Sequence, residues 1–213
     1  MTVGFQLFLA DGVTVQADDK YRNLTVREKG SAATTNLSNA GGTSFVVFYR
    51  TGLTMPLIAV AGTGFAVGQI WFDTAGNRWG IMLVSGGGVG TQVPYFIFDV
   101  PFDTDPHLGL QVFNAAGQKT FDIMQKYMRI NDMYSASARP TTTRNYDAAR
   151  TYACIHMQVG FSISAQAGNT MLYATRANAG VVTGQGMIVD GPQGVSTINE
   201  GTAVILVIDV SNY

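Results

Sequence analysis

Apolar and polar residues follow one another along this chain in short runs that have the character of strands. The runs are rich in β-branched and aromatic residues and are bounded by Gly, Asn, Asp and Pro. In the first half, the expected strands are residues 4–9, 13–15, 21–26, 44–50, 56–61, 69–72, 78–84 and 94–100. In the second half, they are residues 109–113, 118–123, 127–133, 151–158, 160–164, 171–175, 181–189 and 203–210. The one helix candidate, residues 148–152, lacks the length of a convincing helix. The pattern predicts an all-β protein of antiparallel strands.

The opening of the chain is repeated near its middle. Five positions match without a gap, Gly4, Gln6, Phe8, Ala10 and Gly12 against Gly109, Gln111, Phe113, Ala115 and Gly117. The closing strands of the two halves, residues 95–100 and 205–210, also correspond. A matching start and a matching end indicate a duplicated module. We therefore expect two tandem, duplicated antiparallel β-sandwich modules, residues 1–102 and 109–213, joined by a linker at 103–108.

Two polar stretches interrupt the strand pattern at corresponding places in the two halves. Residues 28–43 and 135–145 consist largely of Gly, Ser, Ala, Thr and Asn, without periodic apolar positions. This composition predicts a long loop in each module.

Composition restricts the classes of partner. Charged residues make up 13% of the chain, about half the usual share, and the net charge is −1. No polybasic surface for phosphates follows from that balance, so nucleic acid is not an expected partner. A sparsely charged exterior is typical of a subunit that is largely covered by neighbours. No apolar run is long enough to cross a bilayer, and the N-terminus lacks the basic region of a signal peptide, so we expect no membrane insertion and folding in a cytoplasm.

The residue types that carry catalysis are scarce. Cys154 is the only cysteine and lies in an apolar run, as a buried structural thiol does. His107 falls in the linker and His156 inside a strand, and neither has a nucleophile–base partner or metal-ligand spacing beside it. Glu28 and Glu200 are the only glutamates, although carboxylates for glycoside hydrolysis meet only in three dimensions and stay open as an alternative. We expect no catalytic residue and thus no enzyme.

Two further patterns resemble ligand sites only superficially. The glycines of residues 85–90 lack the Lys-Ser/Thr and the following helix of a phosphate loop. Asp99, Asp103 and Asp105 lack the glycine turn and distal carboxylate of a calcium loop. We expect no metal site and no cofactor.

Trp71, Trp79 and Tyr95 are the candidate binding residues. The two tryptophans flank the turn signal at 73–77, which would make them neighbours on one hairpin. Flat aromatic faces with polar edges suit contact with a sugar or a partner protein. Aromatic packing inside a sandwich accounts for the same residues, and both interpretations stay open.

The repeated segment resembles a known family. Residues 109–122, continuing to residues 126–130, are similar to the opening of small tail proteins of long-tailed bacteriophages, in which a G-L-x-V-F-N-x-x-G strand–turn–strand begins a β-rich virion subunit. The first copy departs from this pattern, with Leu9 and Asp11 in place of Asn114 and Ala116. No functional residue is carried over.

The resemblance implies a non-catalytic structural or host-recognition component of a tail tip, baseplate or fibre, assembled in the host cytoplasm and located in the virion tail. Its expected partners are itself, as a trimer, and other tail proteins, with a host surface glycan or receptor as a further candidate. A carbohydrate-binding β-sandwich module is the alternative function. A polysaccharide-degrading enzyme is the third.

Overall fold

The computed structural model describes residues 6–8, 15–18, 23–38, 42–103, 109–137, 140–163, 169–190 and 199–213. Several positions discussed above, namely Gly4, residues 9–14, Asp105 and His107, lie outside these described residues. Within the described part of the chain every regular element is a strand, and each strand pairs antiparallel with its neighbours. The all-β prediction is confirmed.

Six strands form a first layer in which each half of the chain contributes one side. Their order is β3 (Thr25–Ala33), β9 (Gln92–Asp99), β6 (Leu57–Ala61), β14 (Tyr152–Gln158), β18 (Asn199–Asp209) and β12 (Ile130–Ser137). The first three come from the first half and the last three from the second, in mirrored order. In the first half β9 is the middle strand, between β3 and β6, and in the second half β18 is the middle strand, between β12 and β14.

The second layer repeats this arrangement. Its order is β4 (Asn36–Leu37), β5 (Ser44–Arg50), β8 (Arg78–Ser85), β7 (Ala66–Asp73), β16 (Thr170–Asn178), β17 (Val181–Asp190) and β13 (Thr142–Asn145). β15 (Phe161–Ile163) pairs with both β16 and the start of β18, and so connects the two layers. The order β5, β8, β7 is mirrored by β13, β17, β16, whereas β4 and β15 have no counterpart among the described strands of the other half, and the duplication stays a prediction.

The two halves meet inside the sheets and not only at a linker. In the first layer β6 pairs with β14, where Val60 lies opposite Cys154 and Ala59 opposite Ile155. In the second layer β7 meets β16 at Ala66 and Thr175. The halves are therefore joined more closely than a tandem arrangement divided at 103–108 would have them.

Four apolar cores account for the unbroken hydrophobic runs in the sequence. The smallest joins β7, β8, β16 and β17 of the second layer through Val67, Val84, Ala174 and Met187. One core fills the space between the layers in each half, around Ile97 and Leu83 in the first and Ile205 and Tyr173 in the second. The remaining core lies on the other face of the first layer and spans both halves, from Phe98 to Ile208. The closing parts of β9 and β18, residues 95–99 and 205–209, are thus buried on both faces, and their sequences lack polar alternation because no position there faces water.

Both predicted polar loops contain strands, so that prediction was wrong. β3 continues to Ala33, and the stretch 135–145 holds the end of β12 and all of β13. β3 lies at the edge of its layer, and its side chains alternate between partly buried and exposed. Its backbone pairs with β9 from Thr25 to Ala33, and this ladder holds the strand without an apolar periodicity.

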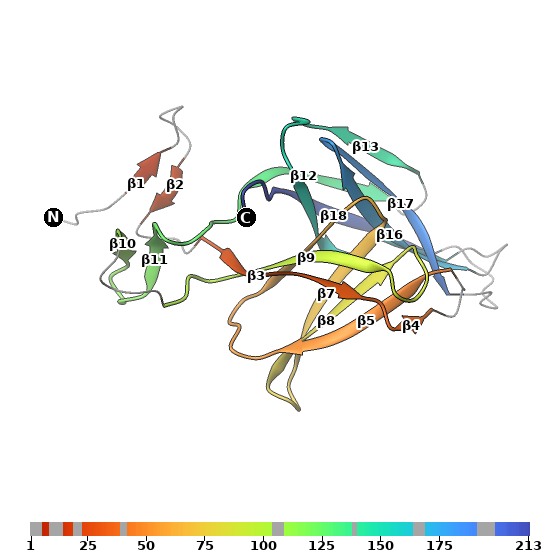
Figure 1. Ribbon diagram of the computed structural model, residues 1–213, viewed down its shortest axis with the longest axis horizontal. Helices are drawn as coiled ribbons and strands as arrows, with labels where there is room; N and C mark the ends of the chain where they lie inside the picture. Colours follow the sequence, from red (N-terminus) through yellow and green to blue (C-terminus); the bar gives the residue numbers. More distant parts are fainter. Residues whose placement is uncertain are drawn as a thin grey trace.

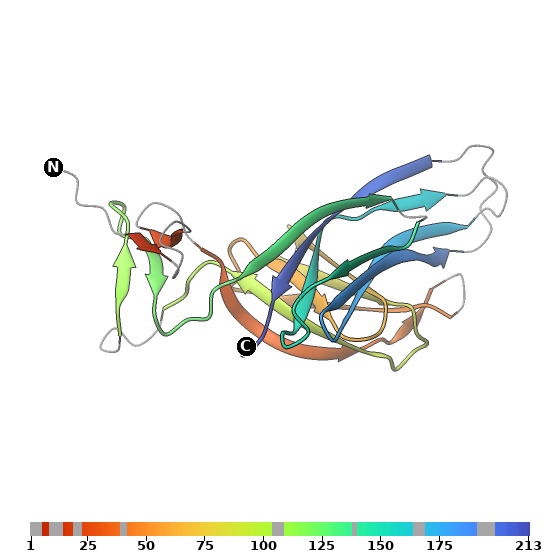
Figure 2. The same ribbon diagram turned by 90° about the horizontal axis from the view of Figure 1, so that it is seen from above.

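The repeated segments form two matching hairpins at one end of the molecule. They are β1 (Gln6–Phe8) with β2 (Val15–Asp18) and β10 (Gln111–Phe113) with β11 (Lys119–Asp122). Each has an irregularity at the same step, between Leu7 and Phe8 and between Val112 and Phe113. The hairpins lie side by side, apart from the layered body and near the C-terminus (Figures 1 and 2). The two repeated segments thus have the same local geometry.

Candidate functional site

Residues 109–122, the segment that resembles tail proteins, determine the shape of the β10–β11 hairpin. The Asn114 side-chain oxygen accepts the backbone N–H groups of Ala116 and Gln118, at 3.0 and 2.9 Å. Gly117 closes the turn with a φ of 74°, which glycine adopts without steric cost. Gly109 has a φ of 80°, and a Cβ there would lie 2.5 Å from Ile123 Cγ2. These motif residues therefore serve the geometry of the hairpin.

A buried ion pair anchors the same hairpin. Lys119 Nζ lies 3.1 Å from Asp122 Oδ2, and both side chains are buried. The Lys119 ammonium also donates to the carbonyl of Phe102 at 3.2 Å, and Gln125 Nε2 donates to that carbonyl at 2.6 Å. Phe121 stacks on Tyr127 with ring centroids 5.1 Å apart. The hairpin is thus fixed on the segment that precedes it and on the segment that follows.

Four large apolar side chains on this anchored hairpin are open to solvent, Phe113 at the turn end of β10 and Leu110, Ile123 and Met124 at the opposite end. We call Leu110, Ile123 and Met124 the hairpin cluster. Their exposed fractions lie between 48% and 58%, and the backbone N–H of Ile123 donates to the Leu110 carbonyl at 2.9 Å. A compact apolar cluster on a well-anchored projection is the usual form of a protein contact surface.

The predicted hairpin around 73–77 is present, but its register separates the two tryptophans. Trp71 lies opposite Gly80, and Phe72 lies opposite Trp79. Because successive side chains point to opposite faces of a sheet, Trp71 and Trp79 are on different faces. The structure therefore does not bring Trp71, Trp79 and Tyr95 together as one site.

Trp79 lies on the core-facing side of the second layer, and Tyr95 of β9 lies on the core-facing side of the first layer. Trp79 is half-buried, donates from Nε1 to the Leu53 carbonyl at 3.0 Å, and packs against Phe72 at 5.2 Å. Tyr95 is 5% exposed and donates its hydroxyl to Glu28. These contacts favour a packing role for both residues.

Glu28 and Arg50 form a two-point ion pair beside Tyr95. Arg50 Nε and Nη2 each lie 2.7 Å from a Glu28 carboxylate oxygen. The hydrogen bond from Arg50 is the main cause that lowers the pKa of Glu28, against the opposing effect of burial. Glu28 thus connects β3 to the second layer, and its charge is already matched.

Trp71 points outward and forms part of an aromatic row on the outer face of the second layer. Tyr49, Gly80 and Trp71 lie directly across from one another on β5, β8 and β7. Trp71 and Tyr49 make an edge contact at 6.5 Å, and both are about 40% exposed. The Arg78 guanidinium lies over Tyr49 at 3.7 Å and pairs with Asp73 at 2.9 Å.

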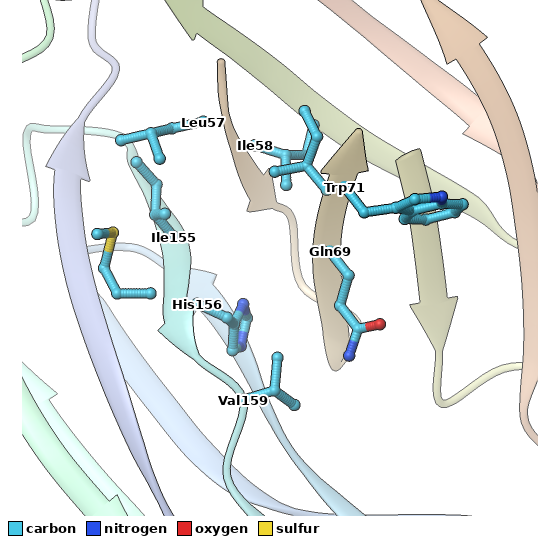
Figure 3. A pocket seen from close by; sticks show the side chains of 10 residues that line it. Leu57, Ile58, Gln69, Trp71, Ile155, His156 and Val159 are labelled. Atoms are coloured by element: carbon cyan, nitrogen blue, oxygen red, sulfur yellow. The ribbon is translucent and has the colours of Figure 1, made fainter. Parts of the chain in front are cut away.

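A cavity of about 340 Å³ opens where β6 and β7 separate from β14. Its lining residues are Leu57, Ile58, Gly68, Gln69, Ile70, Trp71, Ile155, His156, Met157 and Val159. Figure 3 shows Gln69 and Trp71 on one strand and Ile155 and His156 on the strand across from it, with the Trp71 indole directed away from His156. None of the lining residues has a carboxylate, ammonium or guanidinium group.

His156 is the titratable group of this cavity. It is 8% exposed, its Nε2 lies 3.4 Å from Thr175 Oγ1, and its Nδ1 has no hydrogen-bond partner. Burial lowers its pKa to about 4, so the ring is neutral at pH 7. Neighbouring Cys154 is buried, as expected, and burial raises the pKa of its thiol to about 12. A reactive thiolate at that position is disfavoured.

Neither metal-ligand clusters nor spanning helices occur in the described residues. No group of three or more His, Cys, Asp or Glu side chains there is arranged to hold a metal ion. None of the same residues forms a helix long and apolar enough to cross a membrane.

Comparison of the chain with protein-family models, with curated proteins and with solved structures finds no match.

Proposed function

We propose that this chain is a non-catalytic subunit of a bacteriophage tail, located at the tail tip, baseplate or fibre and acting in assembly or host attachment. The observation that carries this proposal is the position of the hairpin cluster. The segment that resembles tail proteins forms a hairpin that projects from the body and exposes Leu110, Ile123 and Met124.

The geometry separates the residues that shape the hairpin from those available to a partner. The turn and its close packing depend on Gly109, Asn114 and Gly117. The side chains of the hairpin cluster, in contrast, are about half exposed to solvent. Burying three such side chains would stabilise a complex by several kcal/mol before the costs of association, at roughly 1.5–3 kcal/mol for each full burial. The low share of charged residues agrees with a subunit covered by neighbours.

A symmetric oligomer is the proposed form of the subunit. Closed point-group symmetry is the common way for identical chains to cover apolar surface. The resemblance to tail proteins implies a trimer, and the hairpin cluster is the surface through which we expect it to form. The site of action is then the virion tail.

The alternative of a carbohydrate-binding module is favoured by one observation, the exposed aromatic row of Tyr49 and Trp71. The two functions are compatible, since a tail subunit that attaches to a host can bind its surface glycans.

The test combines virion localisation with a variant of the hairpin cluster. Virions of the phage that encodes the chain are labelled with antibody against it and imaged by electron microscopy, and label at the tail end is expected. The double variant Ile123→Ser/Met124→Ser should shift the purified protein from trimer to monomer in light scattering and lose its place in the virion. Met133→Ser is the matched control, because Met133 is also exposed but lies on β12.

Two results would refute the proposal. One is the absence of the chain from intact virions. The other is a double variant that assembles into tails as the wild type does while circular dichroism shows the same fold.

A further inference from the structure

The outer face of the second layer carries one partly exposed tryptophan, Trp71, that lies outside the apolar cores. Trp71 is 39% exposed and is not among the residues of the four apolar cores. Trp71 and Tyr49 are exposed together and in contact, so they form a continuous aromatic surface. Exposed apolar surface that is continuous is the kind that marks interaction sites.

Gly80 fixes how Trp71 is held. A Cβ on Gly80 would lie 2.4 Å from both Cε2 and Cζ2 of the indole, so the ring occupies the place of the missing side chain. Tyr49 meets the indole on the far side of Gly80, at an interplanar angle of 77°. The ring is thus supported from below by backbone and from the side by a second ring, and its orientation is set before any ligand arrives.

Polar groups of both hydrogen-bonding types flank the indole on the same face. Gln69 precedes Trp71 by two residues on β7 and supplies an amide donor and acceptor. Asp73 follows it by two residues and is paired with Arg78, an interaction that lowers the pKa of Asp73. The Asp73–Arg78 pair carries no net charge but still offers acceptor and donor atoms at its edges.

This combination selects among ligand classes. A charged ligand finds no unmatched charge, because Arg78 and Asp73 neutralise one another. An apolar protein partner would have to remove water from the Asp73–Arg78 pair, which is costly. A sugar ring presents C–H groups to an aromatic face and hydroxyl groups to its rim, and the flanking amide and ion pair can satisfy those hydroxyls.

We propose that Trp71, together with Tyr49, Gln69 and the Asp73–Arg78 pair, forms a binding surface for a neutral sugar unit of a surface polysaccharide. The host cell as the source of this polysaccharide rests on the proposed tail function. The sugar chemistry itself rests only on the geometry of the surface.

The experiment measures binding of the full chain to an array of neutral hexose and N-acetylhexosamine oligosaccharides, with acidic oligosaccharides as comparators. Hits are titrated by calorimetry. Trp71→Ala should weaken binding of a neutral hit by about tenfold or more, which corresponds to about 1.4 kcal/mol. Trp71→Phe keeps an aromatic face and should retain part of the affinity. Phe72→Ala is the matched control, because Phe72 is exposed on the same hairpin but on the opposite face.

Three outcomes would overturn the sugar site. They are binding to no neutral oligosaccharide, binding to acidic oligosaccharides alone, and binding of a neutral hit that Trp71→Ala and Phe72→Ala affect equally. Any of these would leave the virion-labelling result untouched, so failure of the sugar site and failure of the tail function are distinguishable.

Discussion

Ala59 of β6 lies opposite Ile155 of β14, and both side chains are buried where the two halves of the chain join. Ala59 and Ile155 also occupy the same place in their halves, each in a strand that pairs with the central strand of its side. The pair thus lies close to the point at which the mirrored orders of the two halves meet.

The first prediction is that neither half folds alone. Residues 1–103 or 109–213 expressed separately would expose the apolar core that spans both halves, including Phe98 in one fragment and Ile208 in the other. We expect each fragment to aggregate or to bind a hydrophobic dye without a cooperative unfolding transition. Co-expression of both fragments should restore a soluble complex. A separate fragment that unfolds cooperatively as a monomer would contradict this expectation.

The sequence indicates the strands well but not which residues face one another across them. The turn at 73–77 is evident from Asp73 and Gly76, and Asp73 indeed accepts the Gly76 N–H at 3.2 Å. Whether Trp71 lies opposite Trp79 or Gly80 depends on the length of the turn by a single residue, and that choice moves a side chain to the other face. The residue type made Trp71 a candidate from the sequence alone. Its grouping with Trp79 and Tyr95 depended on the register of the strands, which the sequence does not reveal.

Pairing between strands that are far apart in the chain also cannot be predicted from the local sequence. β3 has few apolar side chains, and it is a strand because β9 supplies a backbone ladder from the far end of the first half. The contact of β6 with β14 also depends on residues far apart in the chain. No local signal marks either pairing. Tyr49 and the hairpin cluster were missed because exposure of an apolar residue is not visible in sequence alone.

The second prediction concerns the two tryptophans. Trp79→Ala should reduce the free energy of unfolding by about 3 kcal/mol, the lower end of the range of roughly 3–5 kcal/mol for truncation of a buried aromatic residue. The reason is that Trp79 is half-buried and donates a hydrogen bond to the Leu53 carbonyl. Trp71→Ala should cost less, about 1–2 kcal/mol, since Trp71 is 39% exposed and its ring packs over Gly80 and against Tyr49. Urea denaturation of both variants provides the comparison. Equal losses for the two would show that the hairpin faces are assigned incorrectly.

The third prediction tests a buried carboxylate that ties a loop to the first layer. Asp99 accepts backbone N–H groups from Thr54 at 2.8 Å, Met55 at 2.7 Å and Val100 at 2.9 Å. Asp99→Ala would leave these donors unpaired, at a cost of about 3 kcal/mol or more. Asp99→Asn keeps one acceptor oxygen and should cost roughly half as much. Thermal or urea unfolding measures both.

Asp103→Ala is the control for Asp99, because Asp103 is exposed. It should change the free energy of unfolding by no more than about 0.5 kcal/mol. Should Asp99→Ala prove as mild as this control, the carboxylate would not be what holds residues 54 and 55 in place.

The last prediction is a pH dependence of stability that comes from His156. Its pKa is about 4 in the folded protein, because burial disfavours the charged ring, and near 6.5 in an unfolded chain. Between these values the unfolded state binds a proton that the folded state does not, so stability falls as the pH decreases from about 6.5 towards 4. The full loss is about 3 kcal/mol.

The carboxylates affect stability in a lower range of pH. Glu28 and Asp209 have lowered pKa values in the folded state, so their contribution is present above their unfolded pKa values and is lost only as the pH falls through the folded ones.

The two ranges can therefore be separated by experiment. Urea unfolding of the wild type and of His156→Gln at several pH values from 4.5 to 7.5 isolates the effect of the histidine, because glutamine does not titrate. The wild type should lose stability steadily below about pH 6.5, while the free energy of unfolding of His156→Gln should stay nearly level over the same range. The comparison uses slopes, so a constant penalty from the substitution does not affect it. Parallel slopes in the two proteins would mean that His156 takes up its proton in the folded state at an ordinary pKa, and that the cavity beside it admits water freely.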